Sequence, residues 1–557
     1  MKIKNVVVHN FRSIVDASFV MQDYTLVIGA NNAGKSSVID ALRCFYEADK
    51  ESKFVYERDF PKHGAVDKES WIEITYKLTV EENSSLKEEY QSKDCRLILR
   101  KYLYAAEKTR MGAIFFKDGD GNISDNAFYG AKNVQCGKIG DLIYIPALSK
   151  VEDQTKLSGP SVLRDLISKI FESVVEGSKP YGTLVDQVNK FSQDISELET
   201  DDHRSIRGFE KGFNESITDW GAEFALDIKT PTVSEMVKNM VSWHLKDVAL
   251  DSEHPIERYG SGFQRHFIYS LIRLSAKFLP HTGKGKIKDF TPDFTLLLFE
   301  EPEVFLHPQQ QDVLAQSLRK IGCNDSWQVL CTSHSPHFVS HNIGDLKSIV
   351  RIQKKDRVSD MYQIGDKELA EILKDLPFDP SVYPLLASKY NSTTDPDIES
   401  IKFIISLNPF RAGAFFADKV LLVEGTTEQA FINKLIEDGK IEIPFSVFVL
   451  DCLGKYNIFR FMRLLNALGI SHSVLHDEDS SAEHKEWNAL TMASKMPLTE
   501  VIERMNPDLE GYLGVATPDK KNSKPQVLLA KYARGEIGES AVERFISIVE
   551  KCLGTIK

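Results

Sequence analysis

Hydrophobic and polar positions follow several distinct periods along the chain. Tyr24–Ile28 is a short continuous apolar run, which is typical of a buried strand. In residues 37–46, Val38, Leu42 and Phe45 recur at helical spacing and predict a helix with one buried face. The N-terminal part of the chain is therefore expected to contain a strand, a short loop and a helix in direct succession.

The pattern changes twice more before the middle of the chain. Residues 71–80, 96–104 and 111–117 alternate between apolar and polar and predict a strand-rich lobe. From about residue 161 to residue 240 the spacing becomes helical, which predicts a helical insertion. Such an insertion can simply pack on its own domain. Because long insertions between the halves of a nucleotide-binding fold often mediate pairing, dimerisation is the alternative interpretation.

A second alternation of strands and helices fills the C-terminal third. Apolar runs at 418–423, 445–450 and 473–475 predict strands, and the segments between them, such as 458–468, have helical spacing. Strands that alternate with helices indicate a parallel sheet with the crossover helices on its faces. The polar, proline-containing stretch 353–408 before them is expected to be a connecting region.

The composition argues against only a few classes of protein. The chain has 557 residues, 42% of them hydrophobic and 27% charged. It lacks an apolar run near the roughly 18 residues of a membrane span and a signal-peptide core, so the cytoplasm is expected. Seven cysteines form no C-x-x-C pair, which argues against disulfides and structural zinc. The net charge of -12 argues against a nucleic-acid coat protein but leaves a local basic groove possible.

The loop after the first apolar run has the pattern of a phosphate-binding P-loop. Residues 29–37 read GANNAGKSS and match G-x-x-x-x-G-K-[ST]. Glycines let successive N–H groups point at phosphates, and the following helix adds its positive dipole end. The lysine is expected at the β and γ oxygens and the first serine at Mg2+. The residues expected to hold a triphosphate are Gly29, Asn32, Gly34, Lys35, Ser36 and Ser37.

Three further motifs follow in order. Residues 259–265 read YGSGFQR, a polar glycine turn ahead of an apolar helix at 266–278. The apolar residues 296–299 run into Glu-Glu-Pro-Glu, which places carboxylates at the end of a buried strand. Residues 329–332 lead into Ser-His-Ser-Pro. Each motif is common alone, but the order behind a P-loop is specific.

This set resembles the ABC-type ATPase heads of the RecF, SMC and OLD families over roughly residues 1–355, and the opening residues 10–13, Asn-Phe-Arg-Ser, resemble their N-terminal strand motif. The resemblance implies a Walker B metal position, a base for the attacking water, a signature turn that caps nucleotide on another subunit, and a switch histidine. Glu300 corresponds to the Walker B metal position and Glu301 to the base. Ser261, Gly262 and Gln264 correspond to the signature turn, and His334 corresponds to the switch histidine. Glutamate rather than aspartate at position 300, and GSGFQ rather than SGGQ, favour the OLD branch.

Carboxylates follow the predicted strands of the C-terminal third. The carboxyl ends of parallel strands are where functional groups gather, and four acids stand at such ends, with a fifth in the next helical turn. They are Glu424, Asp451, Asp477, Asp479 and Glu428. Like charges at short range are unfavourable without a cation, and oxygen ligands without a nearby Cys or His cluster indicate Mg2+ or Mn2+. A single acid after a strand is usually a turn or cap residue, and for Asp451 both interpretations stay open.

Glu-Gly after one strand and Asp-x-Asp after another resemble Toprim domains over about residues 415–557, and the strings FFADKVLLVEGTTE, LGKYN and VLHDED resemble the OLD version. The resemblance implies that Glu424 is a metal ligand or general acid-base, that Asp477 and Asp479 bind metal, and that Glu428 belongs to a second metal. Asp451 can assist. OLD nucleases also use a late lysine, for which Lys524 is expected first and Lys531 second, and Glu510 is a further possibility.

The sequence thus predicts an α/β protein of the OLD family, an ABC-type P-loop ATPase head with a helical insertion followed by a Toprim domain with a parallel sheet. The expected boundaries are 1–160 and 243–355 for the ATPase, 161–242 for the insertion and probable dimerisation element, 356–414 for a linker and 415–557 for the Toprim nuclease domain.

The chain is expected to be an ATP-binding, Mg2+- or Mn2+-dependent DNA endonuclease with nucleotide-regulated activity that acts as a homodimer or higher homo-oligomer. The resemblance to the OLD family further implies a role in anti-phage defence. Some relatives act beside a helicase and others beside a reverse transcriptase with its RNA, and the sequence does not choose between them. The alternative is a non-nucleolytic DNA-repair or bridging ATPase of the RecF/SMC kind. A topoisomerase or primase is disfavoured, because no region remains for a DNA gate and the cysteine spacing gives no zinc module.

Overall fold

The chain forms two compact units, residues 1–147 with 286–557 and residues 148–285. We describe each unit by itself. The computed structural model describes residues 1–47, 51–129, 139–147, 162–175, 177–200, 204–226, 229–248, 251–278, 290, 292–340, 343–372, 379–393, 408–444, 446–518 and 523–554. Within these ranges, none of the helices has the length and apolar character needed to span a membrane.

The first sheet of the larger unit is antiparallel and forms a strand-rich lobe, as the alternating segments predicted. Its strand order is β2-β1-β4-β5-β6-β7. The strands are β1 (Lys2–Phe11), β2 (Ile14–Val20), β4 (Ser70–Lys77), β5 (Arg96–Tyr104), β6 (Ile114–Lys117) and β7 (Ile123–Ala127).

The second sheet carries the P-loop. Its order is β14-β13-β3-β12-β11-β8, and all neighbours are parallel except β14, which pairs antiparallel with β13. The strands are β3 (Tyr24–Ile28), β8 (Asp141–Ile145), β11 (Thr295–Glu300), β12 (Trp327–Thr332), β13 (Ile349–Lys355) and β14 (Val358–Gln363), with α1 (Lys35–Tyr46) after β3 and α10 (Pro308–Gly322) after β11. The central strands are buried, in keeping with their apolar runs.

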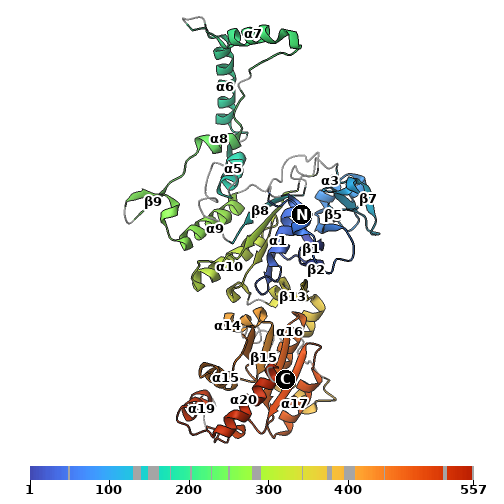
Figure 1. The fold of residues 1–557 in the computed structure, drawn as a ribbon, viewed down its shortest axis with the longest axis vertical. Helices are drawn as coiled ribbons and strands as arrows, with labels where there is room; N and C mark the ends of the chain where they lie inside the picture. The colour runs from blue at the N-terminus through green and yellow to red at the C-terminus, as the bar shows by residue number, and fades with distance from the viewer. Residues whose placement is uncertain are drawn as a thin grey trace. The chain divides into compact units, whose positions relative to one another are not determined.

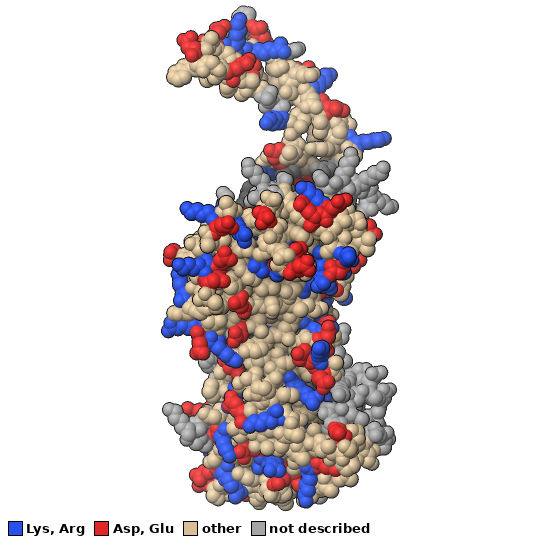
Figure 2. All heavy atoms as spheres, turned by 90° about the vertical axis from the view of Figure 1, so that its right-hand side faces the viewer, with Lys and Arg blue, Asp and Glu red and all other residues tan. Residues whose placement is uncertain are grey.

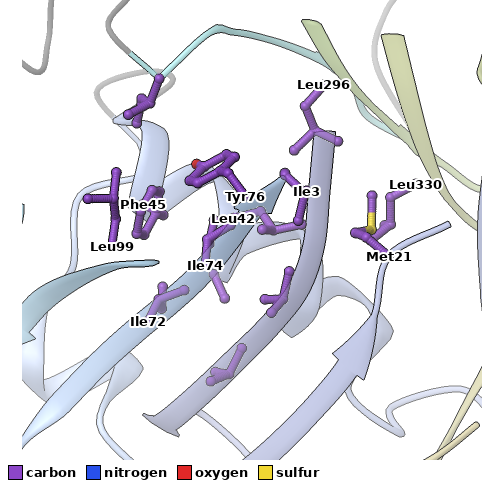
Figure 3. Close-up of a cluster of buried hydrophobic side chains, with 14 of the residues drawn as sticks. Ile3, Met21, Leu42, Phe45, Ile72, Ile74, Tyr76, Leu99, Leu296 and Leu330 are labelled. Carbon is purple, nitrogen blue, oxygen red and sulfur yellow. The ribbon is translucent and has the colours of Figure 1, made fainter. Parts of the chain in front are cut away.

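One hydrophobic core joins the two sheets. Figure 3 shows Leu42 and Phe45 of α1 beside Ile74 and Tyr76 of β4, and all four side chains are at most 1% exposed. Because α1 begins directly at the phosphate-binding loop, this packing fixes the loop against the lobe. Buried apolar surface contributes about 25 cal/mol per Å2, so this core stabilises the position of the loop.

The β13–β14 hairpin lies in the second sheet and extends it to Gln363, beyond the boundary at residue 355 that the sequence predicted. The rest of the predicted linker contains α11 (Asp366–Ile372), α12 (Pro384–Thr393) and α14 (Pro409–Ala412). Residues 373–378 and 394–407 of that linker, and residues 148–160 of the predicted first ATPase part, are outside the described ranges.

The third sheet has the predicted parallel arrangement, in the order β16-β15-β17-β18. Its strands are β15 (Lys419–Val423), β16 (Val447–Asp451), β17 (Ser471–Asp477) and β18 (Thr499–Met505); the helices of this domain are α15 (Thr426–Glu437), α16 (Lys455–Ala467), α17 (Ala482–Ala493), α18 (Leu509–Tyr512), α19 (Lys524–Ala533) and α20 (Glu539–Leu553). Phe445, predicted to begin the second strand, is outside the described residues. Figure 1 shows this domain in orange to red.

The second unit is mainly helical. It contains α5 (Val162–Val175), α6 (Lys179–Glu197), α7 (Ile206–Ile217), α8 (Val233–Met240), the short hairpin β9 (Leu245–Asp247) and β10 (Ser252–His254), and α9 (Ser261–Phe278). Large apolar side chains are exposed on it, including Phe191 (56%), Phe209 (57%) and Trp220 (85%). The signature turn predicted as part of the second ATPase segment begins α9 in this unit.

Candidate functional sites

The P-loop forms the tight turn that the positions of its glycines predicted. Gly29 and Gly34 have φ angles of 154° and 115°, and a Cβ on Gly29 would lie 2.3 Å from the carbonyl oxygen of Ile352. Only glycine fits such an approach. Gly34 is the N-cap of α1, so the helix starts at Lys35. The loop therefore points the helix N-terminus at its own concave side, as phosphate binding requires.

A cavity of about 610 Å3 lies over this loop. Its lining includes the predicted residues Asn32, Gly34, Lys35, Ser36, Ser37 and Glu301. The Lys35 ammonium donates to the carbonyl oxygens of Gly29 and Ala30, at 3.0 and 3.1 Å. Burial lowers the pKa of Lys35 to about 8, although Glu301, Glu303 and Glu300 act in the opposite direction. An anion in the cavity would favour the charged form of this lysine.

The predicted Mg2+ position brings together the two expected groups. The Ser36 hydroxyl donates to Glu300 Oε1 at 2.5 Å, although the two residues are 264 positions apart. The other oxygen of Glu300 accepts a hydrogen bond of 2.8 Å from the Tyr144 hydroxyl, on β8. The sequence analysis missed Tyr144, because nothing in its strand distinguishes this tyrosine before the β8–β11 pairing is known. A hydroxyl and a carboxylate in contact fit a hard cation held with nucleotide.

Glu301 and His334 meet at the same edge of the sheet. His334 Nε2 lies 3.5 Å from Glu301 Oε1, and Glu301 adopts a left-handed backbone with φ 43°. Burial and Lys35 lower the pKa of His334. Glu303 accepts a hydrogen bond from the backbone N–H of His334 at 2.5 Å, and burial raises the pKa of Glu303. The pairing agrees with the predicted base and switch histidine, whose roles stay predictions.

The signature residues Ser261, Gly262 and Gln264 lie in the second unit at the start of α9. Gln264 Nε2 donates to the carbonyl oxygens of Ile256 and Tyr259, at 3.0 and 2.7 Å, and so fixes its own turn. Their role toward nucleotide stays a prediction.

The acids of the C-terminal domain lie at the carboxyl ends of neighbouring strands. β15 ends before Glu424 and β17 ends on Asp477, and these two strands pair directly. The backbone N–H of Asp477 lies 3.3 Å from Glu424 Oε2. Glu428, in the first turn of α15 and 5% exposed, accepts a 2.9 Å hydrogen bond from the Gly425 N–H. Parallel pairing therefore gathers the residues as the sequence predicted.

The carboxylates of this cluster are buried close to one another, which raises their pKa values. Burial, with the charges of Glu428 and Glu424, raises the pKa of Asp477. Burial also raises the pKa of Glu428, and burial, opposed by Lys455, raises that of Glu424. Among the described residues, no three His, Cys, Asp or Glu side chains are already arranged to hold a metal ion. The donor set is nonetheless all oxygen and strained by like charges, which fits hard divalent ions after side-chain movement.

Lys455 is the internal cation of the cluster, and the sequence analysis gave it no role. Its ammonium lies 2.8 Å from Asp479 Oδ2 and 3.7 Å from Glu424 Oε2, and its side chain is only 4% exposed. His484 Nδ1 is 3.0 Å from the same oxygen of Asp479. Lys455 is the first residue of α16 and follows the N-cap Gly454. The Gly-Lys pair at this helix start was the sequence feature that could have identified Lys455.

Asp451 has a different environment from the other strand-end acids. Its two carboxylate oxygens accept hydrogen bonds from Arg411 Nε and Nη2, both at 2.8 Å, and the residue is 1% exposed. A bidentate arginine already neutralises this carboxylate and competes with metal binding. The contacts favour the structural interpretation that the sequence left open.

Lys524 lies beside the acids, whereas Lys531 does not contact them. Lys524 Nζ is 3.1 Å from Glu510 Oε1. Burial acts to lower the pKa of Lys524, but Glu510, with smaller contributions from Asp477 and Asp508, raises it. Glu510 is itself buried. Lys531 donates a long, exposed hydrogen bond of 3.4 Å to the Ala516 carbonyl. The geometry favours the first-named of the two predicted lysines.

Comparison with protein families gives two matches. An AAA ATPase domain model matches residues 1–139 and 117–339, and an overcoming lysogenization defect protein-like TOPRIM domain model matches residues 415–479. The second match contains Glu424, Glu428, Asp477 and Asp479.

Three curated relatives are similar to the chain. The Old nuclease of Escherichia phage P2 is 26% identical over 537 residues, covering 91% of this chain and 82% of that protein. Endonuclease GajA of Bacillus cereus (strain VD045) is 22% identical over 574 residues, covering 98% of this chain and 87% of that protein. The OLD nuclease of Thermus scotoductus is 28% identical over 184 residues, covering 33% and 30%.

Two solved SMC heads also resemble the chain. The SMC head bound to the C-winged helix domain of ScpA has 12% identity and a TM-score of 0.40, and covers 67% of this chain and 100% of its own. The SMC head domain from Thermotoga maritima has 11% identity and a TM-score of 0.32, and the match covers 66% of this chain and 100% of the SMC head.

The family matches agree with the two sites found in the larger unit. The P-loop, Glu300 and His334 lie within the ATPase match, and the strand-end acids lie within the TOPRIM match. The chain therefore belongs to the AAA ATPase domain family over its N-terminal three-fifths and carries an OLD-like TOPRIM domain behind it.

Proposed function

We propose that the chain is an ATP-binding, divalent-metal-dependent DNA endonuclease whose cleavage activity is regulated by nucleotide. The observation that carries this proposal is the gathering of Glu424, Glu428, Asp477 and Asp479 at the carboxyl ends of two paired parallel strands. The names of the relatives, Old nuclease and endonuclease GajA, support the same activity.

Mg2+ or Mn2+ held by Glu424, Glu428, Asp477 and Asp479 would activate a water and stabilise negative charge on the phosphodiester. The protein contributes the remaining parts. Glu424, whose Oε2 lies 3.3 Å from the backbone N–H of Asp477, would act either as a metal ligand or as the general acid-base. Lys524, beside Glu510, presents a cation to a non-bridging phosphate oxygen. Lys455 holds Asp479 and Glu424 in place.

DNA would contact the protein locally. On the face shown in Figure 2, basic and acidic side chains are interspersed, in keeping with the net charge of -12. Phosphate contacts then come from single lysines and arginines near the acids rather than from a wide basic surface, so we expect a modest salt dependence of DNA binding.

In the ATPase part, Lys35 and Ser36 would bind the phosphates and Mg2+ of ATP. Glu300 would hold the ion through its contact with Ser36, and Glu301, beside His334, would orient the attacking water. We assign ATP a regulatory role, because its pocket contains none of the acids of the TOPRIM domain.

The test of nuclease activity is plasmid cleavage. Supercoiled DNA is incubated with Mg2+, Mn2+ or EDTA, each without nucleotide, with ADP and with ATP. The wild type is expected to nick or linearise the plasmid with metal only. Asp477→Ala should lower the rate at least a thousandfold, and the exposed-acid control Glu437→Ala should cut like the wild type. Equal cutting by wild type and Asp477→Ala contradicts the proposal. A wild type that binds DNA and ATP but never cuts favours the RecF/SMC-like alternative.

We also propose that the chain acts as a homodimer or larger homo-oligomer through its second unit. Phe209, Phe213 and Trp220 are exposed there by 57%, 42% and 85%, which is unusual for a monomer surface. Light scattering should give at least twice the monomer mass for the wild type. Phe213→Asp should shift the protein towards monomer, and a wild type that is monomeric at micromolar concentration contradicts this assignment.

Anti-phage defence is the biological role that we propose. Bacteria that express the chain should form fewer plaques when challenged with a panel of phages. Asp477→Ala should restore plaque numbers if the nuclease causes the protection. Equal plaque numbers with and without the wild-type chain across the panel argue against this role.

A further inference from the structure

The β13–β14 hairpin contacts the nucleotide pocket of the larger unit at one end and the TOPRIM domain at the other. β13 pairs with β3, and the register places Arg351 beside Ile28, the residue that precedes the P-loop. β14 is the outer strand of the same sheet, and Tyr362 pairs with Arg351 across the hairpin. In Figure 1, β13 lies between α1 and the TOPRIM strand β15. Since Arg351 and Tyr362 are one pair, displacement of either strand moves both residues.

One end of the hairpin reaches the nucleotide pocket. The turn residues Asp356 and Arg357 have φ angles of 48° and 73°, the left-handed pair of a tight hairpin turn that usually contains asparagine and glycine. Arg357 lines the 610 Å3 cavity and its Nη1 lies 3.1 Å from His63 Nε2. The presence of an arginine at a backbone position that favours glycine points to a function for its guanidinium.

The same end also holds the P-loop backbone. Ser359 Oγ donates to the carbonyl oxygen of Ala33 at 2.6 Å, and its backbone N–H donates to the carbonyl oxygen of Ser13 at 2.7 Å. Ser359 is 1% exposed. A change in the path of the P-loop at Ala33 therefore acts directly on β14.

The other end of the hairpin is embedded in the TOPRIM domain. Arg351 is 2% exposed, and its guanidinium donates to the carbonyl oxygens of Phe415, Ala417, Leu468 and Gly469, at 3.2, 2.8, 3.3 and 3.2 Å. Burial lowers the pKa of Arg351 to about 10. Removing the guanidinium would leave these buried carbonyls without a partner.

The four carbonyls belong to the segments that lead into β15 and β17. Ala417 lies two residues before β15, and Gly469 lies two residues before β17. The ring of Tyr362 also packs on Gly469, where an added Cβ would lie 2.6 Å from its Cδ1. The opposite ends of these two strands carry Glu424 and Asp477. Because each strand is a stiff, packed element, a displacement at the start of β15 or of β17 is passed to the acid at the other end of that strand.

We propose that the β13–β14 hairpin couples nucleotide binding to the TOPRIM acids, with Arg357 binding the anionic nucleoside triphosphate and Arg351 passing the movement of the hairpin to the starts of β15 and β17. This inference rests on the proposed nucleotide-regulated nuclease and names the element that performs the regulation. The proposal requires that Arg357 contact the nucleotide in only one hairpin position, which is the differential contact that a population shift needs.

The experiment uses the full-length protein and a non-hydrolysable ATP analogue with Mg2+. Nucleotide affinity is measured with a fluorescent form of the analogue. Hydrogen exchange is then followed by mass spectrometry in residues 415–424 and 468–477, with and without the analogue. In the wild type we expect the analogue to change exchange in both segments at least threefold.

Three variants separate the ends of the hairpin. Asp356→Asn with Arg357→Gly keeps the turn, removes the guanidinium and should weaken nucleotide binding five- to twentyfold. Arg351→Lys keeps a cation but cannot reach four carbonyls, so it should bind the analogue as tightly as the wild type and lose the exchange response. Arg351→Met should do the same. Thermal unfolding shows which Arg351 variant is folded and is to be used.

Arg463→Met is the matched control. Arg463 on α16 donates to the carbonyl oxygen of Glu371 on α11 at 2.9 Å, another contact to the TOPRIM domain that does not involve β13. It should keep the full exchange response. The coupling is overturned if the response persists in a folded Arg351 variant, if the wild type shows none, or if the Arg357→Gly double variant binds nucleotide normally. DNA cleavage is not part of this readout, so a protein that never cuts DNA contradicts the proposed function alone.

Discussion

The two sites of the larger unit occupy the same kind of position and have opposite electrostatics. Each lies at the carboxyl ends of parallel strands, after β3 and β11 in the ATPase part and after β15 and β17 in the TOPRIM domain. In the first, burial lowers the pKa of Lys35 to about 8; in the second, burial and like charges raise the pKa of Asp477. The first site therefore favours an anionic ligand and the second a cationic one.

The two sites also stabilise their unbalanced groups differently. Lys35 is held by the P-loop's own carbonyls, which a phosphate can replace at little cost. The acids are held by protein cations, with Lys455 on Asp479 and Lys524 on Glu510. Ligand binding therefore requires only a turn of one lysine in the ATPase site, but competition between ions in the TOPRIM site.

The largest expected effect tests whether the two sites bind independently. Lys35→Ala removes the cation that faces the triphosphate and should weaken ATP binding at least a hundredfold, about 3 kcal/mol, as expected for a charged hydrogen bond to an anion. The measurement is titration with a fluorescent ATP analogue. The thermal stabilisation by Mg2+ without nucleotide should stay unchanged, because the site proposed for that ion is formed by the TOPRIM acids. Loss of both properties would contradict the separation of the two sites.

The next effect concerns the internal cation. Lys455→Met should lower stability in EDTA by about 1–3 kcal/mol, since it leaves Asp479 and Glu424 without their buried partner; the lower end reflects the 30% exposure of Asp479. It should also enlarge the stabilisation by Mg2+, which no longer competes with an ammonium. Thermal unfolding with EDTA and with Mg2+ measures both.

Lys531→Met provides the control, because this lysine makes only a long, exposed hydrogen bond to the Ala516 carbonyl. It should unfold like the wild type in both buffers. Unchanged metal-free stability of Lys455→Met would show that Lys455 does not offset the acid cluster.

Much of this comparison could be predicted from the sequence. The P-loop residues form a continuous motif with a strand before it and a helix after it. Glu424 and Asp477 follow apolar strand runs, so the rule for parallel sheets was enough to bring them together. In both cases, the residues next to the site in the sequence were enough to predict its position.

What could not be predicted depends on contacts between distant segments. Tyr144 reaches Glu300 across 156 positions, and Arg411 reaches Asp451 across 40. From the sequence alone, Asp451 looks like any strand-end acid, because the arginine that neutralises it lies before the domain's first strand. Lys455 stands in a recognisable glycine-lysine step, but its direction toward Asp479 depends on how α16 packs.

A smaller effect follows from the pKa of Lys35. Nucleotide phosphates favour the charged lysine, so binding raises its pKa above 8 and takes up a proton at higher pH. Affinity should be flat below pH 7 and fall up to about tenfold per unit above pH 8. Calorimetry at pH 8.5–9 in buffers of different ionisation enthalpy should give an uptake near one proton, and near none at pH 6.5. Zero uptake at pH 9 would show that Lys35 stays charged in the free protein.

The smallest expected effect distinguishes charge from shape at the TOPRIM acids. Asp477→Asn keeps the Oδ1 that accepts a 2.9 Å hydrogen bond from the Leu509 N–H and removes the charge that faces Glu428 and Glu424. Because the charged form is disfavoured in the folded protein, the variant should be more stable than the wild type in EDTA by about 1 kcal/mol. Mg2+ should stabilise it little, since one ligand is lost.

The matched control for this variant is Asp438→Asn, which removes an exposed acid at the end of α15 that pairs with Lys434 at 2.8 Å. It should keep the full stabilisation by Mg2+ and change metal-free stability by less than about 0.5 kcal/mol, as usual for a surface pair. A metal-free Asp477→Asn less stable than the wild type would mean that Lys524 and the Leu509 N–H already offset the charge of Asp477. The TOPRIM site would then resemble the ATPase site, balanced before any ligand arrives.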